Sequence, residues 1–186
     1  RFVADYDIAQ ENPFLPEKMP SNGKRVAVIG SGPAGLSAAY YLSLRGYGVT
    51  IFEREEQAGG MLRYGIPEYR LPKYILDKEI DLILSLGIKI KYGSEFGRDI
   101  TAEGLKKCFD AVFLGIGAQK SISMRIEGED SDGVLSGIDF LHDFSCGKEF
   151  AFKGRIVVVV GGGNTAMDAS RTSIRLGAEK VLSLIH

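Results

Sequence analysis

The hydrophobic positions of the chain fall into short apolar runs separated by polar or helix-like stretches. The runs at 25–29, 49–52, 110–116 and 155–160 predict strands, because continuous β-branched and aliphatic residues are typical of parallel sheets. We expect the strands at 49–52 and 110–116 to be buried. Helical stretches lie between these runs, and this alternation predicts an α/β fold.

The helical stretches are predicted from the spacing of their apolar residues and from the residues at their ends. The segment 34–44 follows the first strand, and the segment 72–86 carries an apolar stripe that stops at Gly87. Thr101 is a plausible cap for a helix over 101–109. The other predicted elements are a short helical start at 2–8, a strand at 88–92, a helical turn at 138–144, a helix ending at 176 and a strand at 181–185.

The segment 56–67 combines loop-like and apolar character. It contains three glycines and a proline, yet it also carries Met61, Leu62, Tyr64 and Ile66. Loops exposed to water seldom collect so many apolar groups, so the segment either tucks into the domain or lines an apolar ligand surface. The first alternative is favoured on the residues alone.

A glycine turn joins the first predicted strand to the first helix. The sequence there reads G-x-G-x-x-G from Gly30 to Gly35, and the acid Glu53 follows about 20 residues later, at the end of the next strand. This order is that of a dinucleotide-binding unit. Gly32 would admit a pyrophosphate to the helix N-terminus, and Glu53 would accept hydrogen bonds from the ribose.

Composition and charge exclude several classes of function. The chain has 186 residues, 45% of them apolar, with 24 glycines and a net charge of −1, which offers no case for nucleic acid or an anionic membrane as partner. No apolar run approaches the ~20 residues of a membrane span. The two cysteines, Cys108 and Cys146, form no C-x-x-C motif. We therefore expect core or surface thiols, no intrinsic metal and a cytoplasmic protein.

A second glycine turn decides the class of chemistry. Gly161 to Ala166 reads G-x-G-x-x-A directly after a run of four valines, and a helix and a strand follow it. Two such units suggest two dinucleotides that face each other. Flavin and nicotinamide are the usual pair, because hydride passes from one ring to the other. The alternative is a duplicated scaffold with one inactive site.

With both turns in place, the chain resembles a known family. The stretches VAVIGSGPAGLSAAYYL, FERE, GGMLRYGIPEYRLPK, GED…GIDFL and VVVVGGGNTAMDASRTSIRLGA are similar to the glutamate synthase small (beta) subunit family of NADPH-dependent FAD oxidoreductases. The flavin part of dihydropyrimidine dehydrogenase has similar stretches. The resemblance covers about residues 24–186, and the missing C-x-x-C argues against the thioredoxin-reductase branch.

The resemblance implies a Rossmann-like FAD-binding domain and a set of cofactor-binding residues but no catalytic side chain. The residues implied around the FAD pyrophosphate, ribose and adenine are Gly30, Gly32, Pro33, Ala34, Gly35, Glu53, Arg54, Phe96 and Gly97. Those implied along the ribityl chain and isoalloxazine are Gly60, Met61, Leu62, Arg63, Gly65 and Ile66, with Gly115 and Gly117 near the exit from the domain. Those implied for the nicotinamide dinucleotide are Gly161, Gly163, Asn164, Thr165 and Ala166.

The resemblance also implies how the chain is divided and what lies outside it. We expect a polar lead-in at 1–23, a FAD-binding domain at 24–153 that lacks its C-terminal return, and the opening of an NAD(P)-binding domain at 154–186. The family carries iron–sulfur clusters in an N-terminal cysteine region. This chain has no such region, so we expect a fragment whose electrons pass to clusters in missing regions or on a larger partner subunit.

Three questions stay open at the level of sequence. His186, at the end of the last strand, tilts the choice between NAD and NADP slightly toward NADP. Asp168, four residues after Asn164, is expected to cap or pack rather than to react. The rival functions are a flavin oxidase or monooxygenase, which needs only one nucleotide turn, and a non-catalytic module that binds FAD or adenine nucleotide or docks on a partner subunit.

Overall fold

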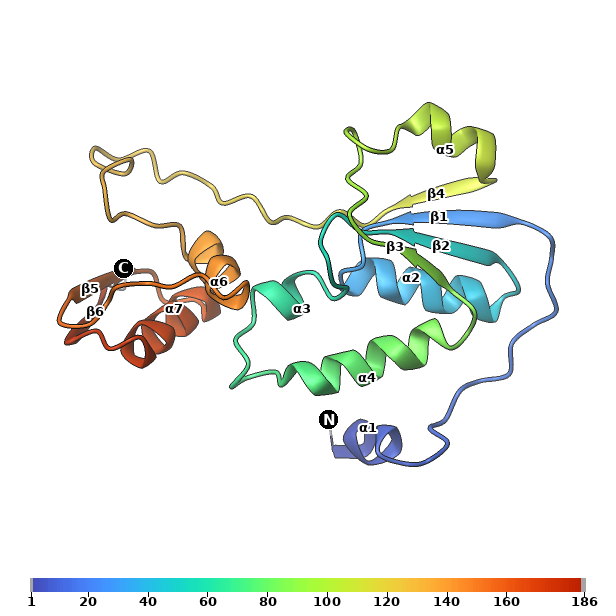
Figure 1. Cartoon of the computed structure of the whole chain (residues 1–186), viewed down its shortest axis with the longest axis horizontal. Helices are drawn as coiled ribbons and strands as arrows, with labels where there is room; N and C mark the ends of the chain where they lie inside the picture. Colours follow the sequence, from blue (N-terminus) through green and yellow to red (C-terminus); the bar gives the residue numbers. More distant parts are fainter. Residues whose placement is uncertain (1, 185–186) are drawn as a thin grey trace. The chain divides into compact units, whose positions relative to one another are not determined.

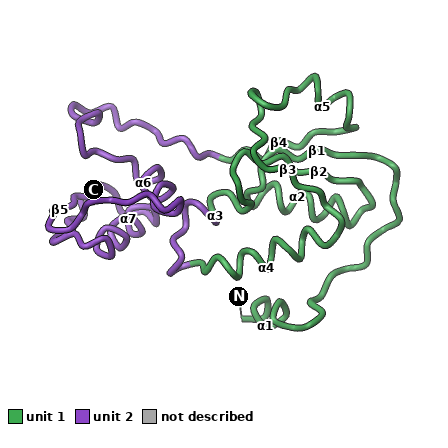
Figure 2. Tube along the Cα trace, viewed as in Figure 1, with its two compact units in different colours: residues 1–62, 71–117 green, residues 63–70, 118–186 purple. Residues whose placement is uncertain are grey.

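The structure is a computed structural model that describes residues 2–184 and forms two compact units (Figures 1 and 2). Unit 1 comprises residues 1–62 and 71–117, and unit 2 comprises residues 63–70 and 118–186. The chain therefore enters unit 2 briefly at 63–70, returns to unit 1, and enters unit 2 again at 118. The predicted cofactor domains, 24–153 and 154–186, are a separate division that stays a prediction.

Unit 1 is built on a parallel sheet with the strand order β3-β2-β1-β4. Val28 of β1 lies opposite Ile51 of β2 and Phe113 of β4. Parallel neighbours need crossover connections, and a helix lies in each of them. The strands and crossover helices are β1 (Arg25–Ile29), α2 (Pro33–Leu44), β2 (Gly48–Phe52), α4 (Lys73–Leu84), β3 (Lys89–Lys91), α5 (Ala102–Cys108) and β4 (Ala111–Leu114).

The core of unit 1 lies on both faces of this sheet, because successive side chains of a strand point to opposite sides. Helices α2 and α4 cover one face and α5 covers the other (Figure 1). The α2–α4 face buries Val26, Val28, Leu36, Val49, Ile51, Leu76 and Ile80. The α5 face buries Ala27, Ile29, Phe52 and Leu105.

The lead-in before β1 is extended but anchored to unit 1. It begins with α1 (Phe2–Ile8), as predicted, and then runs without regular structure to residue 24. The Lys18 ammonium donates to the Leu86 carbonyl oxygen at 2.7 Å, and the Met19 amide donates to the Leu44 carbonyl oxygen at 2.8 Å. Leu44 is the last residue of α2, where carbonyl groups lack intrahelical partners, and Leu86 lies two residues after the end of α4.

Unit 2 contains a two-stranded parallel sheet and two longer helices. Phe140 and Leu141 of α6 pack with Ala169 of α7, and Phe150 and Phe152 pack against this cluster. The elements of unit 2 are α6 (Gly137–Ser145), β5 (Ile156–Val160), α7 (Asn164–Arg175) and β6 (Lys180–Leu184). The chain first passes from unit 1 into unit 2 between residues 62 and 63, within the short helix α3 (Met61–Tyr64).

Most predicted elements are confirmed within two residues, and three expectations need correction. The strand predicted at 110–116 is present as β4, but its residues are exposed rather than buried, because β4 is an edge strand with one neighbour. The loop predicted at 56–67 contains the helical turn α3. The helical turn predicted at 138–144 is a nine-residue helix, whose N-cap Ser136 accepts a hydrogen bond from the Asp139 amide.

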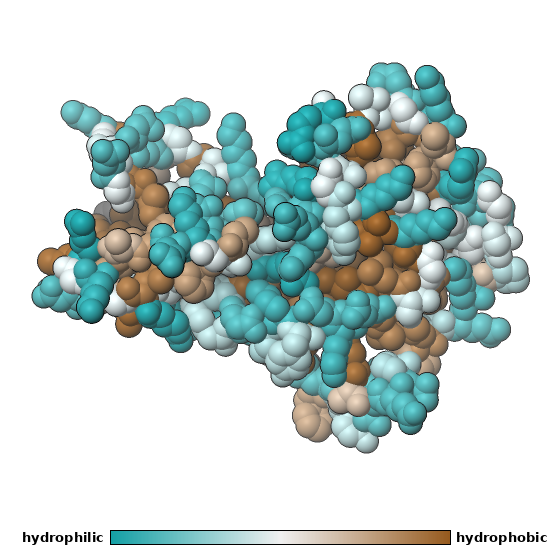
Figure 3. Space-filling model, viewed as in Figure 1, coloured by the Kyte–Doolittle hydropathy of each residue, from teal (hydrophilic) through white to brown (hydrophobic). Residues whose placement is uncertain are grey.

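Apolar side chains also reach the surface in both units (Figure 3). In unit 1 they include Leu114 and Ile116, and in unit 2 they include Ile156, Val158 and Val160 of β5. The four consecutive valines therefore form a strand whose successive residues alternate between exposed and partly exposed positions. Both cysteines are free and exposed, in agreement with the surface alternative.

Candidate functional site: two glycine turns at helix N-termini

The first glycine turn makes close backbone contacts that leave no room for a side chain at its first and last glycines. The Gly30 amide donates to the Phe52 carbonyl oxygen at 2.8 Å, and Gly30 has a φ of +92°. A Cβ on Gly30 would lie 2.5 Å from the Gly115 carbonyl oxygen, and a Cβ on Gly35 would collide with the Gly30 carbonyl oxygen. Glycine is therefore required at both positions.

The segment 56–67, which includes residues predicted to line the flavin, lies directly on this turn. The Gly59 amide donates to the Ser31 carbonyl oxygen at 3.0 Å, and a Cβ on Gly60 would lie 2.8 Å from the Gly32 Cα. Gly60 also has a φ of +52°. The structure thus brings together two stretches that the sequence singled out separately, and α3 begins immediately after Gly60.

The N-terminus of α2 remains open beside these contacts. Gly32 is its N-cap, the helix has no side-chain cap, and its first turn begins with Pro33 and contains no acidic residue. The Gly32 Cβ position has no neighbour closer than 4.0 Å. A helix end with uncapped amides and a positive dipole end favours an anion, so the turn fits a pyrophosphate.

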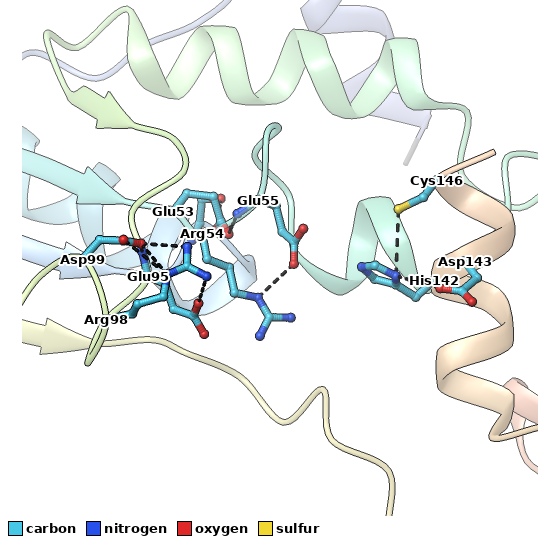
Figure 4. Close-up of polar contacts among 10 residues, drawn as sticks. Glu53, Arg54, Glu55, Glu95, Arg98, Asp99, His142, Asp143 and Cys146 are labelled. Carbon is cyan, nitrogen blue, oxygen red and sulfur yellow. Dashed lines mark hydrogen bonds and ion pairs between the residues drawn. The ribbon is translucent and has the colours of Figure 1, made fainter. Parts of the chain in front are cut away.

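Glu53 lies at the end of β2 beside the turn, and its carboxylate is buried (Figure 4). The Ser31 amide donates to Glu53 Oε2 at 2.7 Å, and the Ser31 hydroxyl donates to the same oxygen. The Glu55 amide donates to the other oxygen, Oε1, at 2.9 Å. Three donors satisfy this buried charge, and the second oxygen keeps acceptor capacity for a ribose hydroxyl. Sequence reasoning missed Ser31, which occupies an unspecified position of the motif.

The residues predicted near the adenine lie around the same strand end. The Ser94 amide donates to the Glu53 carbonyl oxygen at 2.8 Å, which brings the loop carrying Phe96 and Gly97 next to Glu53. In that loop the Arg98 guanidinium binds Asp99 and thereby holds the pKa of the Asp99 carboxyl below its usual value (Figure 4). Arg54 binds the neighbouring Glu55 at 2.8 Å.

The remaining residues predicted for FAD divide between the two units. Pro33 and Ala34 begin α2, Met61 and Leu62 begin α3, and Gly117 ends unit 1 with a φ of +71°. The residues predicted near the isoalloxazine, Arg63, Gly65 and Ile66, belong to unit 2. Arg63 and Gly65 are buried, as are Tyr64 and Pro67, so this apolar loop is tucked into the protein.

The second glycine turn repeats the backbone pattern of the first in unit 2. The Gly161 amide donates to the Leu184 carbonyl oxygen of β6 at 2.8 Å, and Gly161 has a φ of +123°. Gly163 is the N-cap of α7, which again has no side-chain cap and no acid in its first turn. The predicted residues Asn164, Thr165 and Ala166 form that first turn. Among the described residues 2–184, nothing lies within 4 Å of a Cβ on Gly163.

Asp168, one turn further along α7, is buried and bound to the segment 63–70. Arg70 Nη1 donates to Asp168 Oδ2 at 2.6 Å, and the Tyr69 hydroxyl donates to Oδ1 at 3.3 Å. Asp168 thus packs, one of the two expected roles, through partners that sequence reasoning missed. Burial raises the pKa of the Tyr69 hydroxyl, and the negative charge of Asp168 acts in the same direction.

Within residues 2–184, no cluster of His, Cys, Asp and Glu is suited to hold a metal ion. No helix in that range is both long and apolar enough to cross a membrane. His186, on which the choice between NAD and NADP rested, lies outside the described residues.

Two parallel strand–turn–helix–strand units, each with a glycine turn at an uncapped helix, define the class of two-dinucleotide-binding α/β proteins. Residues 24–186 match the family described as pyridine nucleotide-disulphide oxidoreductase. The chain belongs to that family.

Individual relatives agree with this assignment. Over 97% of its length the chain is 46% identical to the NADPH-Fe(3+) oxidoreductase subunit beta of Geobacter sulfurreducens, and over 92% it is 42% identical to the glutamate synthase [NADPH] small chain of Bacillus subtilis. It spans only 27% and 37% of those proteins. The fold matches FprA, a Mycobacterium tuberculosis oxidoreductase, with a TM-score of 0.75 and 23% identity over 89% of this chain and 43% of FprA.

Proposed function

We propose that this chain forms the nucleotide-binding part of an NADPH-dependent FAD oxidoreductase that passes electrons to a further subunit or to iron–sulfur clusters. The observation that carries the proposal is that the same backbone arrangement occurs twice. Each glycine turn precedes a helix without a side-chain cap, and the amide of its first glycine donates to the last carbonyl oxygen of the strand that follows that helix. Relatives named for NADPH at 42–46% identity support the choice of NADPH over NADH.

In this proposal the first turn holds FAD. Gly30, Gly32 and Gly35 keep the backbone close enough for the amides of α2 to bind the pyrophosphate. Glu53 accepts from the adenosine ribose through the oxygen that Ser31 leaves free, and Arg54, Phe96 and Gly97 border the adenine. When bound, FAD accepts a hydride from NADPH and releases electrons to an acceptor.

The second turn, in the same proposal, binds the phosphates of NADPH through the amides of Gly163, Asn164 and Thr165 at the start of α7. Arg63, Gly65 and Ile66 lie in the same unit and are assigned to the isoalloxazine. No side chain needs to act as acid, base or nucleophile, because the chain's task is to align two rings and to exclude water between them.

The test is the visible spectrum of the natural polypeptide that contains these 186 residues, recorded before and after anaerobic addition of NADPH. We expect a flavin band that NADPH bleaches and that NADH bleaches at least ten times more slowly, a selectivity well within the reach of a 2′-phosphate contact. A persistent flavin band would instead indicate the non-catalytic FAD-binding module. No flavin band after incubation with FAD would overturn the proposal.

A further inference from the structure

The buried carboxylate of Asp168 joins two parts of the chain that lie far apart in sequence. It lies on α7, is 3% exposed, and binds Arg70 at 2.6 Å and Tyr69 at 3.3 Å. The Arg70 side chain is 36% exposed, so the buried member of the pair is Asp168, and removing Arg70 would leave that buried carboxylate without its cation. The bond therefore holds the segment 63–70 against α7 whenever unit 2 is folded.

Two ring contacts hold the same segment at its ends. The Arg175 guanidinium of α7 lies 3.9 Å from the centre of the Tyr69 ring, within the range of a cation–π contact. At the other end, the buried Tyr64 ring lies 5.2 Å from the His142 ring of α6, tilted by 31°. The segment is thus fixed to both long helices of unit 2, although residues 62 and 71 on either side belong to unit 1.

Asp168 lies close along α7 to the second glycine turn. Asp168 lies four residues, or about 6 Å of axial rise, from Asn164 at the start of the helix. The same helix therefore carries the second glycine turn at its N-terminus and, one turn later, the anchor for the segment that contains Arg63, Gly65 and Ile66.

We propose that Asp168 is a positioning residue for hydride transfer: through Arg70 and Tyr69 it holds the flavin-side segment 63–70 at a fixed register along the helix that receives the nicotinamide dinucleotide. This inference rests on the proposed function. Its physical basis is that hydride transfer needs the two reacting atoms within a narrow range of distance, so a small shift of one support lowers the rate strongly. Asp168 does not touch the reacting atoms.

The kinetic test measures the rate of flavin reduction by NADPH in the natural polypeptide that contains these residues. We expect Asp168→Asn and Arg70→Gln each to lower the rate at saturating NADPH by about tenfold or more. FAD content should fall much less than the rate, because the first glycine turn and Glu53, assigned to the pyrophosphate and ribose, belong to unit 1, and the half-saturating NADPH concentration should change less than about threefold. Arg70→Lys should restore most of the rate, since Arg70 makes a single N–O contact with Asp168.

Two comparisons separate positioning from general damage. The double variant Asp168→Asn/Arg70→Gln should be no slower than the slower single variant, because both changes remove one interaction. Lys148→Gln is the matched control, since Lys148 and Asp143 form a pair of the same 2.6 Å length on the exposed surface of unit 2. Multiplying effects, or an Arg70→Lys variant as slow as Arg70→Gln, would overturn the proposal.

A second measurement does not depend on hydride transfer. Amide hydrogen exchange over residues 63–70 should accelerate at least tenfold in Asp168→Asn and stay unchanged in Lys148→Gln, because only the first variant releases the segment from α7. If NADPH fails to reduce the wild-type flavin, the proposed function fails while exchange still tests the anchor. If Asp168→Asn does not fold, Arg70→Gln and Tyr69→Phe carry both measurements. Unchanged exchange in the folded variants would refute the anchor.

Discussion

The two glycine turns make the same backbone hydrogen bond in different surroundings. In unit 1, Gly60 and Gly115 press against the turn, and a four-stranded sheet with helices on both faces supports it. In unit 2, a Cβ on Gly161, the counterpart of Gly30, would lie 3.6 Å from the Ala166 Cβ, an ordinary contact, and the sheet of the described residues has two strands with exposed valines. Local sequence thus produces the strand–turn–helix geometry, whereas neighbouring segments decide how tightly it is packed.

The comparison is tested most strongly by adding one methyl group to each turn. Gly30→Ala should lower the free energy of unfolding by about 3 kcal/mol, because its Cβ would lie 2.5 Å from the Gly115 carbonyl oxygen, which is backbone and cannot move away. Gly161→Ala should lower it by only about 1 kcal/mol, because its φ of +123° strains an alanine but its Cβ would make an ordinary contact with Ala166. Urea unfolding of both variants measures the difference, and similar midpoints would show that the two turns are packed alike.

A smaller effect is expected from Glu53, which supports the first turn through hydrogen bonds. Glu53→Ala leaves the Ser31 amide, the Ser31 hydroxyl and the Glu55 amide without their acceptor, at a cost of about 2 kcal/mol. Ser31→Ala removes one of these donors and should cost about 1 kcal/mol. The same unfolding experiment ranks the two variants, and a reversed order would show that the carboxylate is not the centre of this network.

The smallest expected effect concerns the pH dependence of unit 2. The pKa of Tyr69 is raised in the folded state, chiefly by burial, so folding favours the protonated phenol. Its contribution to stability is fully present below the ordinary tyrosine pKa of about 10 and is lost as the pH rises through the higher folded value. The stability of the wild type relative to Tyr69→Phe should therefore fall above pH ~10. A constant difference across that range would contradict the assigned environment.

Much of the fold was predictable because it depends on local pattern. The apolar runs and the helical stripe located the strands and helices, and Thr101 indeed caps α5 by accepting a hydrogen bond from the Gly104 amide. The exposure of β4 was not predictable, because the same run Ala111–Leu114 suits a central or an edge strand. Burial depends on how many neighbours a strand finds, which no local window of sequence contains.

The candidate site likewise contains residues that the sequence predicted and residues that it did not. Sequence placed Gly30, Gly35 and Glu53 at one turn, because motif spacing and parallel-strand geometry bring strand ends to a common edge. It missed Ser31, whose hydroxyl binds Glu53, because any residue is allowed at that place in the motif. It also missed the pairing of Arg70 with Asp168, whose partners are separated by nearly a hundred positions in the chain.

By itself, the sequence determined that this protein is an α/β chain with two dinucleotide turns, since the glycine spacing and hydrophobic period specify backbone geometry residue by residue. Only the tertiary structure decided that Gly60 and Gly115 close the first turn and that Asp168 holds the segment 63–70 on α7. The physical reason is the separation of the interacting residues along the chain. Hydrogen bonds within a turn involve neighbouring residues, whereas the close contacts of Gly60 and Gly115 and the ion pair of Asp168 form only once distant segments have packed together.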